Sequence, residues 1–190
     1  HYVRLRQSYP MTGVLATLVE EEGGVLTSAF GGVIFTRADQ TAFNTLRDLR
    51  RARIAAQDLQ HLAGALAQLH LLKESGVAEV GELDLRFRPF HDDVVRAVLA
   101  GEADAGFVRT GILEAMVAQG QLRWEEVRVM NRQTVPGYPF VVSTRLFPEW
   151  AVIALPHLDP ARSGVRQLRD ELVFPADLHP AQQQRRIGLQ

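Results

Sequence analysis

The segment from His91 to Thr110, HDDVVRAVLAGEADAGFVRT, carries side chains that suit anion binding at both of its ends. His91 stands at a predicted helix start, where exposed backbone N–H groups and the helix dipole favour negative charge. Arg109 and Thr110 follow a short apolar strand predicted over residues 103–108. An Arg guanidinium binds an oxyanion through two parallel N–H donors. We therefore expect this segment to form one wall of a site for a small anion.

A second helix start, at Gln60 and His61, follows a strand predicted over residues 53–57. Both side chains can donate hydrogen bonds. In an open α/β sheet the carboxyl ends of the strands face the ligand crevice, so the two helix starts should lie at the same edge of the sheet. We expect His61 and Gln60 to contact the same anion as His91 and Arg109.

The elements that position these residues alternate along the chain. The predicted strands are 53–57, 83–87, 103–108 and 127–130, and the helices between them are 58–76, 91–101 and 112–120. Helical spacing and turn residues support the helix that begins at His91: it has Asp in its first turn, Gly101 at its end, and one apolar face made of Val94, Val95, Val98 and Leu99. This alternation predicts an α/β fold with a mostly parallel sheet and helices on both faces.

The flanking regions contain strands and turns that we assign to a second, smaller lobe. Strands are predicted at 13–19, 25–36 and 140–143, a turn at 134–139 and an amphipathic helix at 159–173. Gly31 and Gly32 interrupt the second of these strands, which predicts a bulge or a close approach of backbone, and would also suit a hinge between lobes.

Composition excludes several classes of function. The chain has 190 residues, a net charge of −1 and 46% hydrophobic residues, so it suits a globular protein without general affinity for nucleic acid or anionic membranes. It has no cysteine, which excludes a disulfide scaffold, a thiolate nucleophile and Cys-ligated zinc. No apolar run approaches the roughly 20 residues of a spanning helix. Because it begins at His1 without a methionine or signal peptide, we expect a processed chain or a fragment.

Catalytic motifs are lacking. The sequence has no Gly-x-Ser-x-Gly elbow, no Gly-rich phosphate loop and no His-Glu-x-x-His motif, so we expect neither an enzyme nor a cofactor. Three adjacent residues, His91 to Asp93, rarely converge on one metal ion, so no metal site is predicted. Each candidate residue also has a structural interpretation: His91 as a helix cap, Arg109 in an ion pair with Asp92, Asp93 or Glu114, His61 as a helix-start residue, and Tyr138 as a turn anchor.

Several segments resemble the PhnD-like family of phosphate- and phosphonate-type periplasmic binding proteins. They are FGGVIFTRAD at 30–39, LRDLR at 46–50 with RIAA at 53–56, and HDDVV at 91–95 with GEADAG at 101–106. VPGYPF at 135–140 and STRLFPEW at 143–150 are similar to the sensor regions of tetrathionate-sensor-like histidine kinases. The resemblance covers roughly residues 1–160, and HYV at 1–3 is similar to the end of a family Pro-Gly-His-Tyr segment.

The resemblance implies a two-lobed, type II periplasmic-binding fold. It places part of the first lobe and a hinge strand in 1–44, the complete second lobe in 45–130, the return hinge and further first-lobe elements in 131–173, and an irregular tail in 174–190. The family chain begins with a strand and helices upstream of the His-Tyr segment, so the first lobe is expected to be incomplete. An incomplete lobe would expose sheet edge and favour a homodimer.

The resemblance also assigns roles. His91 matches the ligand-contacting His of the family, and Asp58 is followed by Leu59, Gln60 and His61 where the family has small hydroxyl residues. Tyr138 replaces an acidic residue that holds a substrate amine, and Tyr2 could reach the cleft from the other lobe. The function expected is an extracytoplasmic sensor domain that closes its lobes on a small oxyanion (phosphonate, phosphate or a sulfur oxyanion), as the input domain of a two-component histidine kinase attached to the membrane outside this sequence. Alternatives are the solute-binding component of a phosphonate-type ABC transporter and, third, an α/β enzyme.

Overall fold

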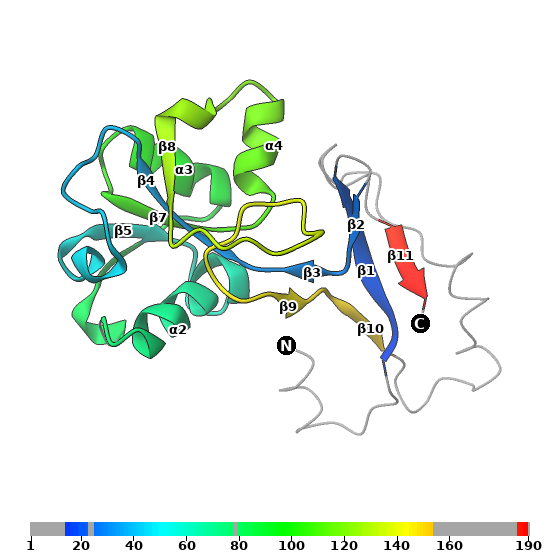
Figure 1. The fold of residues 1–190 in the computed structure, drawn as a ribbon. Helices are drawn as coiled ribbons and strands as arrows, with labels where there is room; N and C mark the ends of the chain where they lie inside the picture. Colours follow the sequence, from blue (N-terminus) through cyan, green and yellow to red (C-terminus); the bar gives the residue numbers. More distant parts are fainter. Residues whose placement is uncertain (1–13, 23–24, 78–79, 154–185, 190) are drawn as a thin grey trace. The chain divides into compact units, whose positions relative to one another are not determined.

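The computed structural model describes residues 14–22, 25–77, 80–153 and 186–189 (Figure 1). The chain divides into two compact units. We call residues 30–147 the central unit, and residues up to 29 together with those from 148 onward the terminal unit. Tyr2 and the predicted helix 159–173 lie outside the described residues.

The central unit is built on a five-stranded sheet with the strand order β6-β5-β7-β4-β8. The bounds of these strands are β4 Gly32–Arg37, β5 Arg53–Ala56, β6 Asp84–Phe87, β7 Ala105–Arg109 and β8 Val127–Met130. β5 runs parallel to β6 and β7, whereas β4 pairs antiparallel with both β7 and β8. Only β4 therefore runs against the others, which confirms the predicted mostly parallel sheet.

Helices cover both faces of this sheet (Figure 1). On one face α3 (His91–Leu99) and α4 (Ile112–Ala118) share an apolar cluster with Val33 and Phe35 of β4. On the other face a π-helical turn, η2 (Leu62–Leu66), leads into α2 (Ala67–Glu74), which packs with the 3-10 helix η1 (Leu46–Arg51) against Ile34 and Phe107. Alternate residues of a strand point to opposite faces, so β4 contributes to both clusters. Two shorter 3-10 helices, η3 (Val80–Glu82) and η4 (Trp124–Glu126), precede β6 and β8.

The terminal unit contains a small antiparallel sheet. Its long strand β1 (Val14–Glu22) pairs with β2 (Val25–Thr27), β10 (Ala151–Ile153) and β11 (Arg186–Leu189). Two short segments, β3 (Ala29–Phe30) and β9 (Phe147–Pro148), pair with each other where the chain leaves one unit for the other. Across the described residues we find no helix of the length and apolar character that crossing a bilayer requires.

The compact units meet at 29/30 and 147/148, and the division into lobes and hinges at 44/45 and 130/131 stays a prediction. β4 belongs to the central unit because it pairs with two strands of the central sheet, and because Ser143 and Thr144 form hydrogen bonds with Gly32 and Ile34 of β4. The predicted strand 25–36 is divided into β2, β3 and β4. The predicted strand 140–143 is replaced by an isolated bridge between Gln133 and Val142. The tail is not wholly irregular, since β11 pairs with β1.

The diglycine permits a close approach of backbone. A Cβ at Gly31 would lie 2.6 Å from a methyl carbon of Val142, and one at Gly32 would lie 2.5 Å from the amide carbon of Gln68. Both distances are far shorter than real Cβ contacts, so only glycine fits without displacing a buried neighbour.

Candidate functional site

Most of the predicted binding residues lie at one edge of the central sheet. β5, β6 and β7 run parallel, and the residues that follow their carboxyl ends include His61, His91 and Arg109. His61 precedes the π-helical turn η2, His91 is the first residue of α3, and Arg109 is the last residue of β7. We call this the carboxyl edge.

His91 is held in an environment that disfavours its positive charge. Burial, followed by the nearby charges of Arg109 and His61, lowers the pKa of His91 from 6.5 to about 4. The ring nitrogen Nδ1 of His91 is buried and has no hydrogen-bond partner among the described residues. A neutral imidazole with one unsatisfied nitrogen therefore stands at the start of α3.

Arg109 is fixed at the end of β7 by strand pairing and by an aromatic ring. Its backbone is opposite Gly32 in the β4–β7 ladder, and its guanidinium carbon lies 4.9 Å from the centroid of the Phe30 ring. Of its possible acidic neighbours, Asp92 and Asp93 lie within 3.7 Å and 3.2 Å of Arg96. Glu114 accepts a hydrogen bond from the backbone N–H of Val141 at 2.6 Å. The ion-pair interpretation of Arg109 therefore stays a prediction beside its role in binding.

An Asp-centred turn orients His61. Asp58 Oδ1 accepts a hydrogen bond from the backbone N–H of Gln60 at 2.7 Å and lies 3.0 Å from Nδ1 of His61. The hydrogen bond from Gln60 is the main reason that the pKa of Asp58 is lowered. In the protonated form of His61, Nδ1–H donates to this carboxylate and Nε2–H is a second donor that can bond to an anion. Gln60 and His61 are both exposed, as direct ligand contacts require.

Thr110 and Tyr138 also lie at the carboxyl edge, where their side chains are hydrogen-bonded to each other. The hydroxyl of Tyr138 donates to Oγ1 of Thr110 at 2.8 Å, and the backbone N–H of Gly31 donates to the same oxygen at 3.1 Å. Thr110 is only 2% exposed. The ring of Tyr138 packs edge-on against Phe140 with centroids 5.6 Å apart. These contacts anchor the 134–139 turn to the end of β7, and they favour the structural interpretation of Tyr138.

Two buried glutamines support the helix starts, and sequence reasoning missed both. Gln68 is fully buried, and its Nε2 donates to the carbonyl oxygens of Ala63 and Val108 at 2.7 and 2.9 Å. Gln57 donates from Nε2 to the carbonyl of Pro89 at 3.2 Å, just before α3. The signal that could have found Gln68 is a polar residue on the apolar face of a predicted helix.

These residues offer hydrogen-bond donors at one edge of the sheet. The carboxyl edge presents Arg109, His61, Gln60 and a depressed-pKa His91, together with backbone N–H groups at the starts of η2 and α3. Within the described ranges no three His, Cys, Asp or Glu residues gather closely enough to hold a metal ion.

Comparison with known proteins agrees with the resemblance in the sequence. The family model of the ABC transporter phosphonate periplasmic substrate-binding protein matches residues 1–174. The tetrathionate sensor histidine kinase TtrS of Salmonella typhimurium is 27% identical over 161 residues, which is 84% of this chain and 27% of that protein. The chain thus spans about a quarter of the length of this curated relative.

Solved structures share the fold at low sequence identity. A Xanthomonas citri protein bound to ATP has a TM-score of 0.64 at 18% identity, covering 87% of this chain and 58% of that one. A binding-protein component of an ABC phosphonate transporter from Pseudomonas aeruginosa has a TM-score of 0.59 at 16% identity, covering 90% and 52%. PhnD1 from Prochlorococcus marinus in complex with methylphosphonate has a TM-score of 0.57 at 18% identity, covering 88% and 58%.

The type II periplasmic-binding fold implied by the sequence is therefore confirmed, although this chain spans less than two thirds of each of these solved proteins. The family model covers most of the chain, and the chain belongs to the phosphonate periplasmic substrate-binding protein family of ABC transporters.

Proposed function

We propose that this domain binds a small oxyanion at the carboxyl edge of the central unit, outside the cytoplasm, and that it works without catalysis. The observation that carries the proposal is the arrangement of His61, His91 and Arg109 at the carboxyl ends of three parallel strands. Burial, followed by the charges of Arg109 and His61, lowers the pKa of His91 to about 4, so its imidazole is neutral near pH 7 and keeps one ring N–H as a donor. The guanidinium of Arg109 and the backbone N–H groups at the helix start beside it favour a negatively charged ligand.

Each residue has a distinct role in this proposal. Arg109 supplies two parallel donors to two oxygens of the anion. His61, oriented through Asp58, and Gln60 supply single hydrogen bonds from the start of η2. His91 supplies one ring N–H. Thr110 and Tyr138 hold the end of β7 and the 134–139 turn in place, since their hydroxyl groups bond to each other. Tyr2 remains a candidate from the expected first lobe.

The ligand class follows from what the site presents. Its described groups are donors and cations, and position 138 carries a tyrosine rather than a carboxylate that would pair with an ammonium group. We therefore favour anions without an amine: phosphate, simple phosphonates and sulfur oxyanions. A relative solved with methylphosphonate and a relative named as a tetrathionate sensor support this range of ligands.

The sensor role is the leading proposal for the whole protein. The match to a sensor histidine kinase, in which this chain corresponds to about a quarter of the length, supports an input domain whose lobes close on the ligand and bias a signalling state. The alternative is a solute-binding component of an ABC transporter, which the family model favours. The full-length gene separates them: a transmembrane helix and kinase region downstream supports the sensor, and a stop codon soon after Gln190 supports the carrier.

Calorimetric titration tests the binding proposal. Phosphate, methylphosphonate, thiosulfate and tetrathionate would each be titrated into the wild-type domain, into Arg109→Met and into a control, Arg47→Met. Arg47 is an exposed residue of η1, so its substitution removes the same charge away from the carboxyl edge. We expect Arg109→Met to weaken binding of the best ligand by about 10- to 100-fold, and Arg47→Met to change it less than about twofold. Equal affinities for wild type and Arg109→Met would refute the site.

A further inference from the structure

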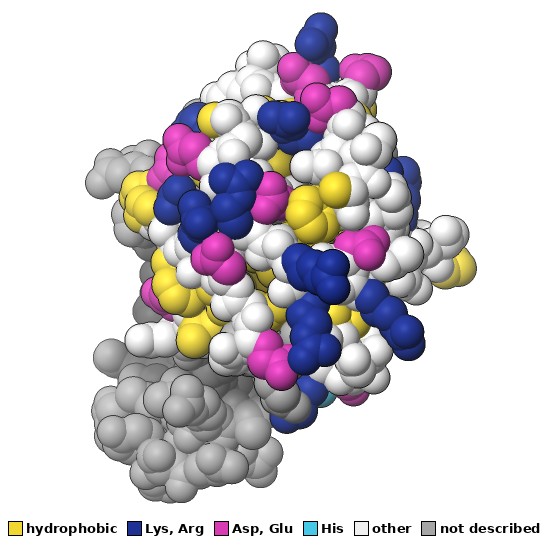
Figure 2. Space-filling model, turned by 90° about the vertical axis from the view of Figure 1, so that its left-hand side faces the viewer, with side chains coloured by type: hydrophobic (Ala, Val, Ile, Leu, Met, Phe, Trp, Pro, Cys, Tyr) yellow, Lys and Arg dark blue, Asp and Glu magenta, His cyan; other side chains and the backbone are white. Residues whose placement is uncertain are grey.

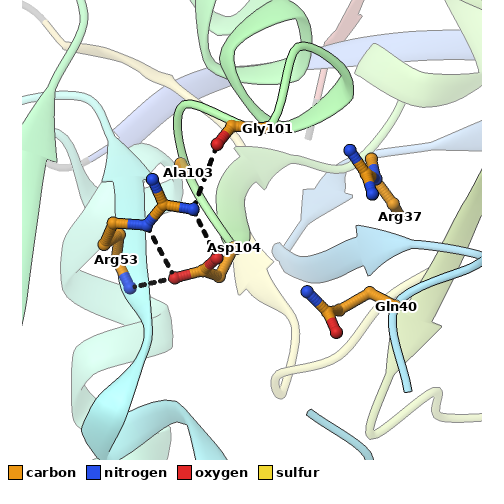
Figure 3. Close-up of a pocket in the computed structure, with 6 residues that line it drawn as sticks. All are labelled: Arg37, Gln40, Arg53, Gly101, Ala103 and Asp104. Atoms are coloured by element: carbon orange, nitrogen blue, oxygen red, sulfur yellow. Dashed lines mark hydrogen bonds and ion pairs between the residues drawn. The ribbon is translucent and has the colours of Figure 1, made fainter. Parts of the chain in front are cut away.

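A polar hollow lies at the opposite, amino edge of the central sheet. Figure 2 views the molecule from the side on which the loop between β4 and β5 lies in Figure 1, and Arg side chains gather there beside carboxylates. The hollow has a volume of about 130 Å³. Figure 3 shows its lining, which comes from the end of β4, the start of β5 and the residues before β7: Arg37, Gln40, Arg53, Gly101, Ala103 and Asp104.

One wall of the hollow is a closed ion pair. Arg53 donates from Nη2 to Asp104 Oδ1 at 2.7 Å, and from Nε and its backbone N–H to Oδ2 at 3.0 and 2.8 Å. Its Nη2 also donates to the carbonyl oxygen of Gly101 at 3.0 Å. These bonds to Arg53 lower the pKa of Asp104, so the carboxylate stays ionised and both its oxygens are occupied. Among the described residues, Nη1 of Arg53 has no partner, and it remains a donor.

The other wall consists of Arg37 and Gln40. Arg37 uses Nε and Nη2 to bind Asp39 at 2.9 and 3.2 Å, which leaves Nη1 without a described partner. This Nη1 lies 3.3 Å from where a Cβ of Gly101 would be, so the missing side chain at Gly101 keeps the hollow open in front of it. The carbonyl of the Gln40 side chain accepts from the backbone N–H of Ala42 at 3.1 Å. Its amide nitrogen therefore points toward the hollow, as Figure 3 shows.

Arg128 of β8 forms hydrogen bonds to the loop that carries Gln40. Nη2 of Arg128 donates to the carbonyl oxygens of Gln40 and Phe43 at 2.8 and 2.7 Å, and Nη1 donates to Oδ1 of Asn44 at 2.9 Å. The loop after β4 is thus fixed at several points. Donors on a fixed backbone lose little conformational freedom when a ligand binds.

We propose that this hollow binds a small tetrahedral oxyanion such as phosphate or sulfate, independently of the carboxyl edge. Arg37 and Arg53 each pair with a carboxylate, of Asp39 and Asp104, and each keeps its Nη1 without a described partner, so together with the amide nitrogen of Gln40 the hollow offers N–H donors to a ligand. The donors come from opposite walls, which suits an anion with oxygens in several directions better than a planar carboxylate. The volume is well below the roughly 300–1,000 Å³ of pockets for drug-sized ligands, so a nucleotide would not fit.

The test is a titration with inorganic phosphate and with sulfate at constant ionic strength, followed by NMR of the ¹⁵N-labelled 190-residue chain. The Nε–H signals of Arg37 and Arg53 and the side-chain amide of Gln40 report on the hollow. The chain would be compared with Arg37→Met, Gln40→Ala, Arg109→Met and the charge control Arg47→Met. Loss of Arg37 leaves an unpaired but exposed Asp39, so the variant should fold normally.

We expect the three signals to shift saturably, with affinity reduced at least about 10-fold in Arg37→Met and about threefold in Gln40→Ala. Arg109→Met and Arg47→Met should leave these shifts unchanged. The proposal is overturned when none of the three signals shifts, or when Arg37→Met and Arg47→Met bind with equal affinity. Because Arg109→Met removes only the carboxyl-edge site, failure of that site would not alter the result at the hollow.

Discussion

The two edges of the central sheet arrange their charges in opposite ways. At the amino edge Arg53 and Asp104 attract each other, and the guanidinium lowers the pKa of the carboxyl. At the carboxyl edge burial, followed by the charges of Arg109 and His61, lowers the pKa of the His91 imidazole to about 4. At the amino edge an ionised carboxylate is paired within the fold, whereas at the carboxyl edge a buried imidazole is kept neutral. The two edges of one sheet therefore depend on pH in different ways.

The largest expected effect concerns the packing beneath the carboxyl edge. In Gly32→Ala the new Cβ would lie 2.5 Å from the amide carbon of Gln68, so either Gln68 leaves its carbonyl partners or β4 shifts. We expect the free energy of unfolding to fall by about 3 kcal/mol, as measured by urea denaturation. Gly81→Ala is the matched control, since its Cβ would meet nothing within 4 Å. Equal stability of the two variants would contradict this packing.

The pH dependence of the free energy of unfolding reports the lowered pKa of His91. Its pKa is about 4 in the folded protein and about 6.5 in the unfolded chain, so between these values the unfolded state binds more protons. Stability is therefore complete above pH 6.5 and is lost progressively as the pH falls toward 4. We expect acidification from pH 7 to 4.5 to cost the wild type about 2 kcal/mol more than His91→Gln, by urea denaturation at each pH. Identical pH profiles would remove the basis for the contrast between the edges.

Breaking the ion pair of the amino edge should change stability and leave carboxyl-edge binding intact. Asp104→Ala deprives Arg53 of an acceptor for its side chain and its backbone N–H. Because Arg53 is partly exposed, we expect a loss of about 1–2 kcal/mol in thermal or urea unfolding. Glu102→Ala serves as control: its pair with Arg88 at 3.1 Å is more exposed, and the loss should be below about 0.5 kcal/mol. A weaker affinity of Arg109-dependent ligand binding in Asp104→Ala would show that the edges are not independent.

The smallest effect sharpens the role of His61. His61 and His70 are both exposed and both lie beside an acid, Asp58 at 3.0 Å and Glu74 at 3.2 Å. We expect His61→Ala to weaken binding of the best oxyanion by about three- to tenfold without changing stability, whereas His70→Ala should change neither. Calorimetry and thermal unfolding measure the two quantities. Comparable affinities in the two variants would assign His61 to the helix start alone.

Local patterns predicted much of the central unit. The strands and helices from β5 to β8 follow the hydrophobic spacing, and Gly76, Gly101 and Gly120 all adopt the positive φ expected of helix stops. The buried face of α3 is the predicted one, with Val94, Val95 and Val98 fully buried. These features depend on neighbours within a few residues, which is why a single sequence reveals them.

Features that depend on distant partners were not predictable in this way. Nothing near Ile34 indicates that it pairs with Phe107 on one side and Met130 on the other, so the place of β4 within the five-stranded sheet was not predicted. The sequence places His61, His91 and Arg109 at strand ends, but it does not reveal that Gln68 and Gln57 tie the helix starts to the sheet. Which carbonyl a buried amide meets is decided by the tertiary packing.

The position of β4 has a consequence for synthesis of the chain. This apolar strand emerges from the ribosome before every other strand of its sheet, yet both of its hydrogen-bonding edges belong to β7 and β8, which are made last. Until β7 and β8 are made, the backbone N–H and C=O groups of β4 have no partner in the native sheet. Pairing of β4 with another nascent copy then competes with folding. Completion of the sheet is therefore a late event that waits for almost the whole central unit.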